Sequence, residues 1–387
     1  MKTSKNKIIP LLIPFLGTEE IEAAKKAILS SWISGNGPEG RKLEAKISKY
    51  LGVRFAVLVN NCTSALHLAL MSLGIKDCEA IIPNYTFTST GLAPILVGSK
   101  PVLCEVDFET ANIDTCSIRK LITKKTKVII PVHYAGLPCN MTEIKKIAKE
   151  YKLFVVEDAA QALGSKYKNK MIGTLGDIGC FSFHSVKNIT CGEGGVLVTN
   201  NKEIYKKAIV MRDKGTNKYF YNQKHSKGFY EYISIGHNFM LSDILAAIAL
   251  EQFKKLKTIN LLRTKHAHYL INGLANVPNL IIPNLFNDRL SNWHLFTVRV
   301  PEGKTEKFIN EMRKRGIETN THYVPLHLNS FYKKFGYRKG NFPVSEKINN
   351  SLVRLPLYPS LTKGNLDKII RSIKETMSII RDSSVFN

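Results

Sequence analysis

The sequence predicts an α/β fold in which a mostly parallel, seven-stranded sheet covered by helices is followed by a smaller α+β region. Seven short, continuously apolar segments recur between residues 55 and 199, as expected for strands buried on both faces of a parallel sheet. Stretches with apolar residues at helical spacing separate most of these segments. A long helical stretch, 241–268, then precedes a C-terminal part that mixes strand and helix patterns.

Each element follows from its own pattern. The expected strands of the sheet are 55–59, 79–83, 102–106, 128–132, 153–157, 178–182 and 196–199. The expected helices up to the end of the sheet are 18–31, 40–51, 64–73, 88–96 and 141–150. The C-terminal part is expected to contain a strand at 293–300 and helices at 305–315 and 366–380, with Gly316 as the residue that ends the first of these helices. We place a large domain at residues 1–258 and a small α+β domain at residues 259–387.

Composition narrows the class of protein. The longest apolar runs are too short to span a bilayer, and no apolar signal-peptide core follows the basic residues 1–7, so we expect a cytoplasmic protein without membrane contact. The seven cysteines contain no C-x-x-C pair, which argues against a disulfide framework and a zinc site, and we expect no metal. The net charge of +25 is spread along the chain without a nucleic-acid motif, and it suits a solvated surface or a phosphate-bearing substrate.

Two segments carry the residue types that a pyridoxal 5′-phosphate (PLP) site needs. The apolar strand at 153–157 is followed by Asp158, where open α/β sheets bind ligands, and Lys187 follows the strand at 178–182 just before a glycine-rich stretch. A lysine amine can form a Schiff base with the cofactor aldehyde, and a carboxylate can keep the pyridine nitrogen protonated. Taken alone, Asp158 could instead be a helix N-cap with Gln161 in a capping box, and Lys187 a solvated lysine.

With these motifs the chain resembles the DegT/DnrJ/StrS family of sugar aminotransferases, which are fold-type-I PLP enzymes, from Ile13 to about Asp367. The resemblance implies that Lys187 is the Schiff-base lysine, that Asp158 pairs with the pyridine nitrogen and that Gln161 contacts the phenolic oxygen of the cofactor. It also implies cofactor-phosphate contacts from Cys62, Thr63, Ser64, Ser182 and, from the neighbouring subunit of a homodimer, Asn238. A strand followed by small polar residues and a helix start directs N–H groups at an anion, although Thr or Ser at such a turn is more often an ordinary N-cap.

The same resemblance implies residues around the cofactor ring and the substrate. Phe87, with Tyr85 as second choice, matches the aromatic residue that stacks on the ring, and a core aromatic is the alternative for both. The implied substrate contacts are Ser34, Gly35, His322, Tyr323 and His327. The sequence leaves open whether His184 has a catalytic or a structural role. Gly35–Gly40 fits G-x-G-x-x-G, but it follows no apolar strand and contains Pro38, which disfavours a dinucleotide-binding loop.

The resemblance implies transamination of a nucleotide-linked 4-keto-6-deoxy sugar with L-glutamate as donor, for surface polysaccharide synthesis. Cys62 and the stretch 213–218 resemble the subgroup that converts TDP-4-keto-6-deoxy-D-glucose to TDP-4-amino-4,6-dideoxy-D-galactose. UDP- or GDP-linked 4-keto sugars and a TDP-3-keto sugar stay open. Dehydratases of the family are expected to have histidine in place of Lys187. A basic nucleic-acid-binding regulator on the same fold is the alternative from another class, and it would bind DNA in a salt-sensitive way.

Overall fold

A seven-stranded sheet forms the centre of the molecule. We describe a computed structural model of residues 8–220 and 230–382, so the basic residues 1–7 considered above lie outside the described part. The sheet order is β1-β9-β8-β5-β4-β2-β3; β9 pairs antiparallel with β1 and β8, and all the other pairs are parallel. The predicted mostly parallel sheet is therefore confirmed. The strands are β1 (Phe55–Val59), β2 (Glu79–Pro83), β3 (Lys100–Cys104), β4 (Thr126–Ile129), β5 (Phe154–Asp158), β8 (Ile178–Ser182) and β9 (Gly195–Thr199).

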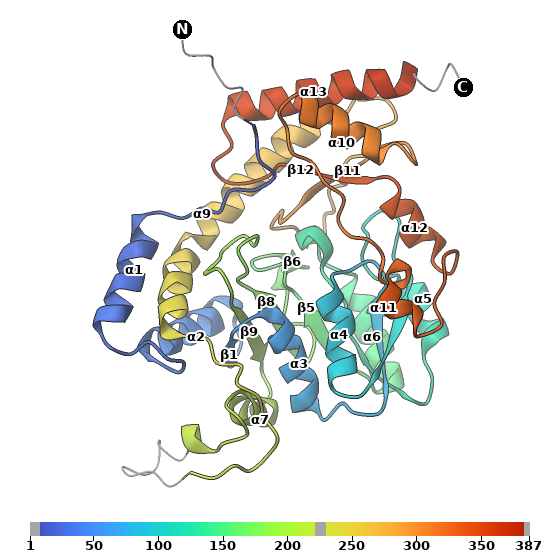
Figure 1. Cartoon of the computed structure of the whole chain (residues 1–387). Helices are drawn as coiled ribbons and strands as arrows, with labels where there is room; N and C mark the ends of the chain where they lie inside the picture. Colours follow the sequence, from blue (N-terminus) through green and yellow to red (C-terminus); the bar gives the residue numbers. More distant parts are fainter. Residues whose placement is uncertain (1–7, 221–229, 383–387) are drawn as a thin grey trace.

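Helices cover both faces of this sheet (Figure 1). Within β1, Ala56 and Leu58 face one hydrophobic core, whereas Val57 and Val59 face the other, because successive strand residues point to opposite faces. The first core is closed by α2 (Pro38–Leu51), α5 (Thr115–Leu121) and α6 (Met141–Tyr151). The second core is closed by α3 (Cys62–Leu73), α4 (Thr88–Leu96) and α7 (Lys202–Arg212).

Three departures from the sequence prediction have physical causes. The third strand begins two residues earlier than expected, at Lys100, because β3 is an edge strand and tolerates Pro101. Helices α5 and α7 were missed, although the side chains of Asp114 and Asn201 cap them. The short hairpin β6 (Lys166–Tyr167) and β7 (Lys170–Met171), with β10 (Arg289–Leu290) added at one edge, has strands too short to show a period.

The C-terminal part is built on α9 (Asp243–Leu274), which extends from α1 (Thr18–Leu29) and α2 to the opposite end of the molecule (Figure 1). There it packs with β11 (Phe296–Arg299), β12 (Leu352–Leu355), α10 (Thr305–Lys314) and α13 (Lys363–Asp382) around a separate hydrophobic core. Gly316 has a φ of +70° directly after the end of α10, which confirms its predicted role. The remaining elements are short: 3₁₀ turns Tyr134–Gly136 and Leu326–Leu328, and helices α11 (Ser330–Lys333) and α12 (Pro343–Asn349). The predicted domain boundary at residue 258 falls inside α9 and stays a prediction.

Two general features bear on the class of protein. In the described ranges, 8–220 and 230–382, no helix combines the length and the apolar character needed to cross a membrane. All seven cysteines are free thiols, and only Cys116 is exposed.

The glycine-rich stretch at residues 35–40 forms the start of α2. The carboxylate of Asp243, at the start of α9, accepts hydrogen bonds from the N–H groups of Glu39 (3.1 Å) and Gly40 (2.7 Å). A Cβ atom on Gly37 would lie 2.3 Å from the Asp243 carboxyl carbon, so this turn encloses a side chain of the protein itself. The N–H groups that a dinucleotide phosphate would need are occupied, in agreement with the sequence argument against a dinucleotide loop.

We expect Asp243→Ala to lower the free energy of unfolding by about 1–3 kcal/mol, because it leaves buried N–H groups at the start of α2 without an acceptor. Asp243→Asn is the matched control, since an amide oxygen can still accept one of these hydrogen bonds and should retain much of the stability. Urea unfolding followed by circular dichroism measures both variants. Equal loss in the two variants would contradict a capping role for the carboxylate.

Candidate active site

The centre of the site is the carboxyl end of β5, where Asp158 lies 5% exposed. One carboxylate oxygen accepts a hydrogen bond from the Thr90 hydroxyl on α4 (2.8 Å), and the other accepts one from the N–H of Ala160 (3.2 Å). Burial raises the pKa of Asp158, whereas the Thr90 hydrogen bond and the positive charge of Lys187 oppose that shift. Residues 159–164 form turns and not a helix, so the capping-box alternative for Asp158 is wrong.

Glu157, the preceding residue, points away from this cluster and is fully buried. Its carboxylate accepts hydrogen bonds from the N–H groups of Gly173 (2.9 Å), Leu175 (2.6 Å) and Gly176 (2.6 Å), and from the ring of His133 (3.1 Å). Because four donors satisfy it, Glu157 anchors the turn before β8 and has no capacity left for a ligand.

Lys187 lies in the loop between β8 and β9. Hydrogen bonds between Phe183 and Gly194 (2.8 Å) and between Cys191 and Phe183 (3.1 Å) close the neck of this loop. The next residue, Asn188, donates from its side-chain amide to Asn260 on α9 (2.8 Å) and to the carbonyl of Asn292 (3.0 Å). The backbone on both sides of Lys187 is thus tied to the sheet and to the C-terminal part.

The Lys187 side chain is half-buried, and within the described chain its amine has no hydrogen-bond partner. Burial lowers its pKa from an ordinary 10.5 to about 8; Arg354 on β12 adds to this shift, whereas Cys62 and Asp158 oppose it. A neutral amine is the nucleophilic form of lysine, so the protein prepares Lys187 for attack on a carbonyl near neutral pH.

Small polar residues at the start of α3 lie on the same side of the sheet. The side chain of Asn61 caps α3 by accepting a hydrogen bond from the N–H of Ser64 (2.8 Å). The alternative that Thr63 or Ser64 is an ordinary helix N-cap is therefore wrong. Thr63 shares a hydrogen bond with Ser89 at the start of α4 (2.7 Å). A Cβ on Gly195 would come within 2.8 Å of the Asn61 and Cys62 backbone, so only glycine lets β9 approach this helix start.

Gln161 connects the cluster to the C-terminal part. Its amide oxygen accepts from the N–H of Ala135 (2.7 Å), and its amide nitrogen donates to the Tyr323 hydroxyl (3.0 Å). The Tyr134 hydroxyl donates to the carbonyl of His322. Burial, with Arg354 and Lys187 adding to it, lowers the pKa of His322 to about 3, so its ring is neutral at physiological pH. His322 and Tyr323 therefore lie in the same neighbourhood as Lys187, as the sequence predicted.

The two aromatic candidates differ sharply in exposure. Phe87 precedes α4, is 54% exposed and lies with its ring 5.7 Å from that of Tyr323. Tyr85 is 1% exposed and packs against Tyr134. An aromatic side chain can stack on a ligand only where its face is accessible, so the geometry favours Phe87 and makes Tyr85 a core residue.

His327 and His184 differ in burial and in their hydrogen-bond partners. His327 is 0% exposed; one ring nitrogen bonds Asn84 (2.8 Å) and the other bonds Glu346 (2.9 Å). Both nitrogens are occupied within the protein, so the structure does not support the predicted substrate contact at His327. His184 is half-buried; one ring nitrogen lies 3.5 Å from the carboxylate of Glu193 and the other accepts from the N–H of Val186 (3.4 Å), so both a structural and a catalytic role stay open.

Three predicted residues lie apart from this cluster within one chain. Ser34 and Gly35 lie against the start of α9, where Gly35 forms a bridge with Ser242. Asn238 is exposed and bridges Asp213. By contrast, Ser182 lines a small cavity together with Lys187 and Gln161.

The structure adds residues that the sequence did not single out. Thr90, which binds Asp158, lies three residues after Phe87 near the start of the helix expected at 88–96, and this position was a usable signal. Arg354 and His294 come from the C-terminal part. Arg354 helps to lower the pKa of Lys187, and the pKa of His294 is lowered by burial and then by the charge of Lys187. No local motif marks these two residues, because only the packing of β12 and of the segment before β11 brings them to the lysine.

The chain was compared with known proteins. The sequence profile of the DegT/DnrJ/EryC1/StrS aminotransferase family matches residues 14–374. The chain is 40% identical over 382 residues to the uncharacterized protein MJ1066 of Methanocaldococcus jannaschii, covering 97% of this chain and 99% of that protein. It is 35% identical over 384 residues to the spore coat polysaccharide biosynthesis protein SpsC of Bacillus subtilis, covering 97% and 98% of the two chains.

The fold has solved counterparts. The putative sugar aminotransferase Spr1654 of Streptococcus pneumoniae, in its apo-form, superimposes with a TM-score of 0.91 at 28% identity, covering 97% of this chain and 99% of that one. The same protein has also been solved in PMP and PLP forms, with a TM-score of 0.90 for each.

The residues present here fit PLP. Asp158 offers a buried carboxylate for the ring nitrogen, the unpartnered amine of Lys187 suits the aldehyde, and the α3 start approached by Gly195 suits the phosphate. Phe87 supplies an exposed ring for stacking, and Gln161 supplies an amide beside the same cavity as Lys187. The fit concerns chemistry and placement, and the role of each residue stays a prediction.

We expect the rate at which cofactor-free protein captures PLP to rise with pH through about 8 and to level off above about 9. The pKa of Lys187 is lowered, so the neutral amine is already present near pH 7, at roughly 300 times the fraction of an ordinary lysine. Stopped-flow absorbance between pH 6.5 and 10 measures the profile. Arg354→Leu removes a neighbouring positive charge and should shift the profile to higher pH, while Arg354→Lys should not. A rate still rising at pH 10 in the parent protein contradicts the lowered pKa.

Proposed function

Because the chain belongs to the DegT/DnrJ/EryC1/StrS aminotransferase family, whose members are PLP-dependent sugar aminotransferases, we propose that it transfers an amino group from L-glutamate to the 4-keto carbon of a nucleotide-linked 6-deoxy sugar. The main observation behind this proposal is that Lys187, Asp158 and the start of α3 lie close together at one edge of the sheet. This arrangement offers a nucleophilic amine, a buried carboxylate and an anion-binding helix start within one site.

Each residue of the site has its own role in the proposed transamination. When bound, PLP supplies an aldehyde that reacts with amines and a ring that stabilises negative charge at the adjacent carbon. Lys187 would hold the cofactor, and its neutral amine, once free of the cofactor, would take the proton from the α-carbon of the amino donor. Asp158 keeps a proton on the ring nitrogen, with Thr90 fixing its orientation. Gln161 is held by Ala135 and Tyr323 beside the cavity that Lys187 lines, and it would contact the phenolic oxygen of the bound cofactor.

The best candidate substrate is TDP-4-keto-6-deoxy-D-glucose, with TDP-4-amino-4,6-dideoxy-D-galactose as product. Support comes from Cys62 and the stretch 213–218, and from the similarity to a protein of spore coat polysaccharide biosynthesis, which suits a surface polysaccharide pathway. UDP- and GDP-linked 4-keto sugars and a TDP-3-keto sugar are the alternatives. The basic surface, with a net charge of +25, would attract the diphosphate of any of them.

We further propose a homodimer whose active sites are shared. Exposed apolar side chains crowd α1 and the segment after it, among them Ile21, Leu29 (73% exposed), Trp32 and Ile33. A largely apolar groove lies between α1 and the loop 185–192, which carries Lys187. Exposed apolar surface of this extent is typical of an interface between proteins, so a second copy seated here would contact the catalytic loop. The exposed Asn238 is available to reach the cofactor phosphate of that second copy.

The absorbance spectrum of the purified holoprotein tests the reaction. We expect L-glutamate to abolish the visible band of the lysine-bound cofactor, and the correct keto sugar to restore it. TDP-, UDP- and GDP-4-keto-6-deoxy sugars and a TDP-3-keto sugar are compared, with TDP-glucose as the non-keto control. Lys187→Ala should lose the band and at least about 10³-fold in turnover, whereas exposed Lys206→Ala should not change either. A band that L-glutamate leaves unchanged would overturn the proposal.

Complementation tests the shared site. Asn238→Asp places a negative charge where the phosphate is expected, and should inactivate the enzyme as Lys187→Ala does. Equal amounts of the two inactive variants are mixed and their subunits allowed to exchange. About a quarter of the parent activity should return, because half of the dimers are then mixed and each mixed dimer has one intact site of two. No recovery would show that Asn238 serves its own subunit. Sedimentation should show monomers for Ile21→Asp with Leu29→Asp, and dimers for the control Leu96→Asp at an exposed leucine elsewhere.

A further inference from the structure

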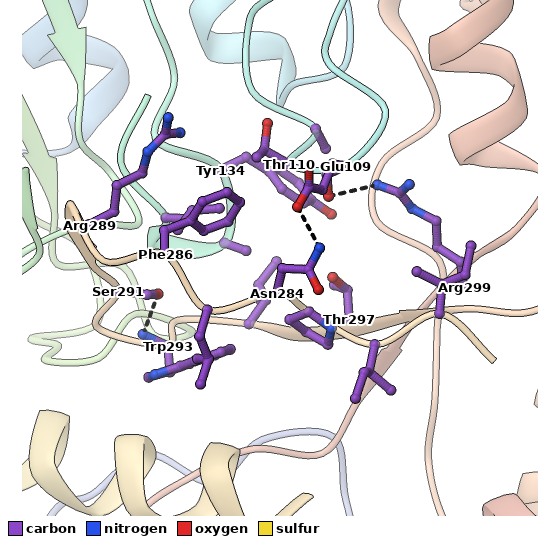
Figure 2. Close-up of a pocket in the computed structure, with 18 of the residues that line it drawn as sticks. Glu109, Thr110, Tyr134, Asn284, Phe286, Arg289, Ser291, Trp293, Thr297 and Arg299 are labelled. Atoms are coloured by element: carbon purple, nitrogen blue, oxygen red, sulfur yellow. Dashed lines mark hydrogen bonds between the residues drawn. The ribbon is translucent and has the colours of Figure 1, made fainter. Parts of the chain in front are cut away.

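A second cavity, of about 260 Å³, lies between the large sheet region and the C-terminal part (Figure 2). One wall comes from residues 109–111 and 134–137, which follow β3 and β4, and the other comes from residues 281–299 with β11. Lys187, Asp158 and Gln161 do not line it. This cavity is therefore separate from the candidate active site, and nothing in the proposed reaction uses it.

Most of the cavity wall is apolar. Trp293, Phe286 and Leu295 form part of it, and Figure 2 shows the rings of Trp293 and Phe286 on the walls of the same space. The rim carries leucine and isoleucine side chains that remain more than half exposed, namely Ile281, Leu285 and Leu290. A concave, aromatic-lined space with an exposed apolar rim is suited to a ligand with an apolar body.

One end of the cavity carries an unneutralised positive charge. Arg299 is 7% exposed, and its guanidinium lies over the ring of Phe108 at 4.1 Å. Its single hydrogen bond within the described chain runs to the carbonyl of Glu109 (3.2 Å), so most of its five donors have no acceptor. Among the described residues no carboxylate lies within 4 Å of the Arg299 guanidinium. Burial lowers the pKa of Arg299, and the nearby Tyr134, Tyr85, Asp107 and Glu109 oppose that shift.

The other charged groups of the lining leave the deep end positive. Arg289 lies on the far side of the space, where it forms an ion pair with Asp288 (3.2 Å) and donates to the carbonyl of Pro138 (3.1 Å). The Glu109 carboxylate is exposed at the mouth and accepts a hydrogen bond from the Asn284 amide. Asp288 therefore balances Arg289, whereas Arg299 has no ion-pair partner among the described residues, and a buried guanidinium without a carboxylate favours an anion.

Size limits the ligand further. The volume of about 260 Å³ is below the roughly 300–1,000 Å³ of sites for drug-sized ligands. A nucleotide-linked sugar is too large to be enclosed here, but an acid of roughly ten non-hydrogen atoms fits.

We propose that this cavity is a binding site for a small monocarboxylic acid with a planar apolar body. The carboxylate pairs with Arg299 in the buried end, where the guanidinium can bind both oxygens. The apolar body lies against Trp293 and Phe286 and covers the exposed rim. Two wall residues also touch the active site: Ala135 donates to Gln161 (2.7 Å) and Tyr134 donates to the carbonyl of His322, so the acid binds one residue layer away from the catalytic cluster.

The probe is 3-phenylpropionate, and its matched neutral control is 3-phenylpropanamide. The chain has two tryptophans, so Trp32→Phe leaves Trp293 in the cavity wall as the only tryptophan reporter. Titration of this holoprotein should show a saturable change in tryptophan fluorescence with a dissociation constant in the millimolar range or tighter. The amide should bind at least about tenfold more weakly, since it lacks the charge that pairs with Arg299.

Variants place the probe in this cavity. Arg299→Gln should weaken binding at least about tenfold, and Arg299→Lys should retain more of it. If Arg299→Gln does not fold, the comparison of acid and amide on the otherwise unchanged protein decides the same point. Affinity should be unchanged in Lys187→Ala and in the presence of saturating L-glutamate, and neither readout requires turnover.

Three outcomes overturn the proposal. They are the absence of a saturable signal up to the solubility limit, equal affinity for acid and amide, and competition by L-glutamate, which would place the acid in the active site. A colourless, inactive protein that still binds the acid would overturn the proposed function and leave this inference standing, so the two proposals fail separately.

Discussion

The site depends on two adjacent carboxylates at the carboxyl end of β5. Because successive strand residues point to opposite faces, Glu157 and Asp158 are buried in different surroundings although they are neighbours in sequence. Glu157 receives four hydrogen bonds and fixes the turn that leads into β8. Asp158 receives only two and keeps capacity for a cationic partner. Glu157 thus stabilises the turn, and Asp158 remains able to bind a cationic partner.

The position of β8 has a direct consequence for Lys187. Since Glu157 fixes the turn at residues 173–176 and β8 pairs in parallel with β5, the loop after β8 returns to the Asp158 side of the sheet. Asn188 then ties that loop to α9 and to the segment before β11. The lysine is held in surroundings that disfavour its charged form, because burial and the nearby Arg354 both lower its pKa.

The C-terminal part does more than cover the sheet. Arg263, buried on α9, donates to the carbonyls of Trp293, His294 and Leu357 and so joins three segments of that part. From there, Tyr323 reaches Gln161 and Arg354 reaches the neighbourhood of Lys187. The same junction encloses the arginine-lined cavity. Both sites therefore lie where two hydrophobic cores meet, since side chains from separate cores seldom fill such a junction completely.

The sequence by itself determined the architecture and the centre of the chemistry. Apolar runs and helical periodicities are local, so they located the ends of all seven strands of the sheet to within three residues, and the order of motifs singled out Lys187 and Asp158. It could not separate Phe87 from Tyr85 or recognise that His327 is enclosed by Asn84 and Glu346, because exposure is a property of packing. Only the tertiary structure brought Arg354 and the Arg299 cavity into place. These depend on contacts between segments far apart in the chain, and such contacts leave no periodic or local signal in the residues that make them.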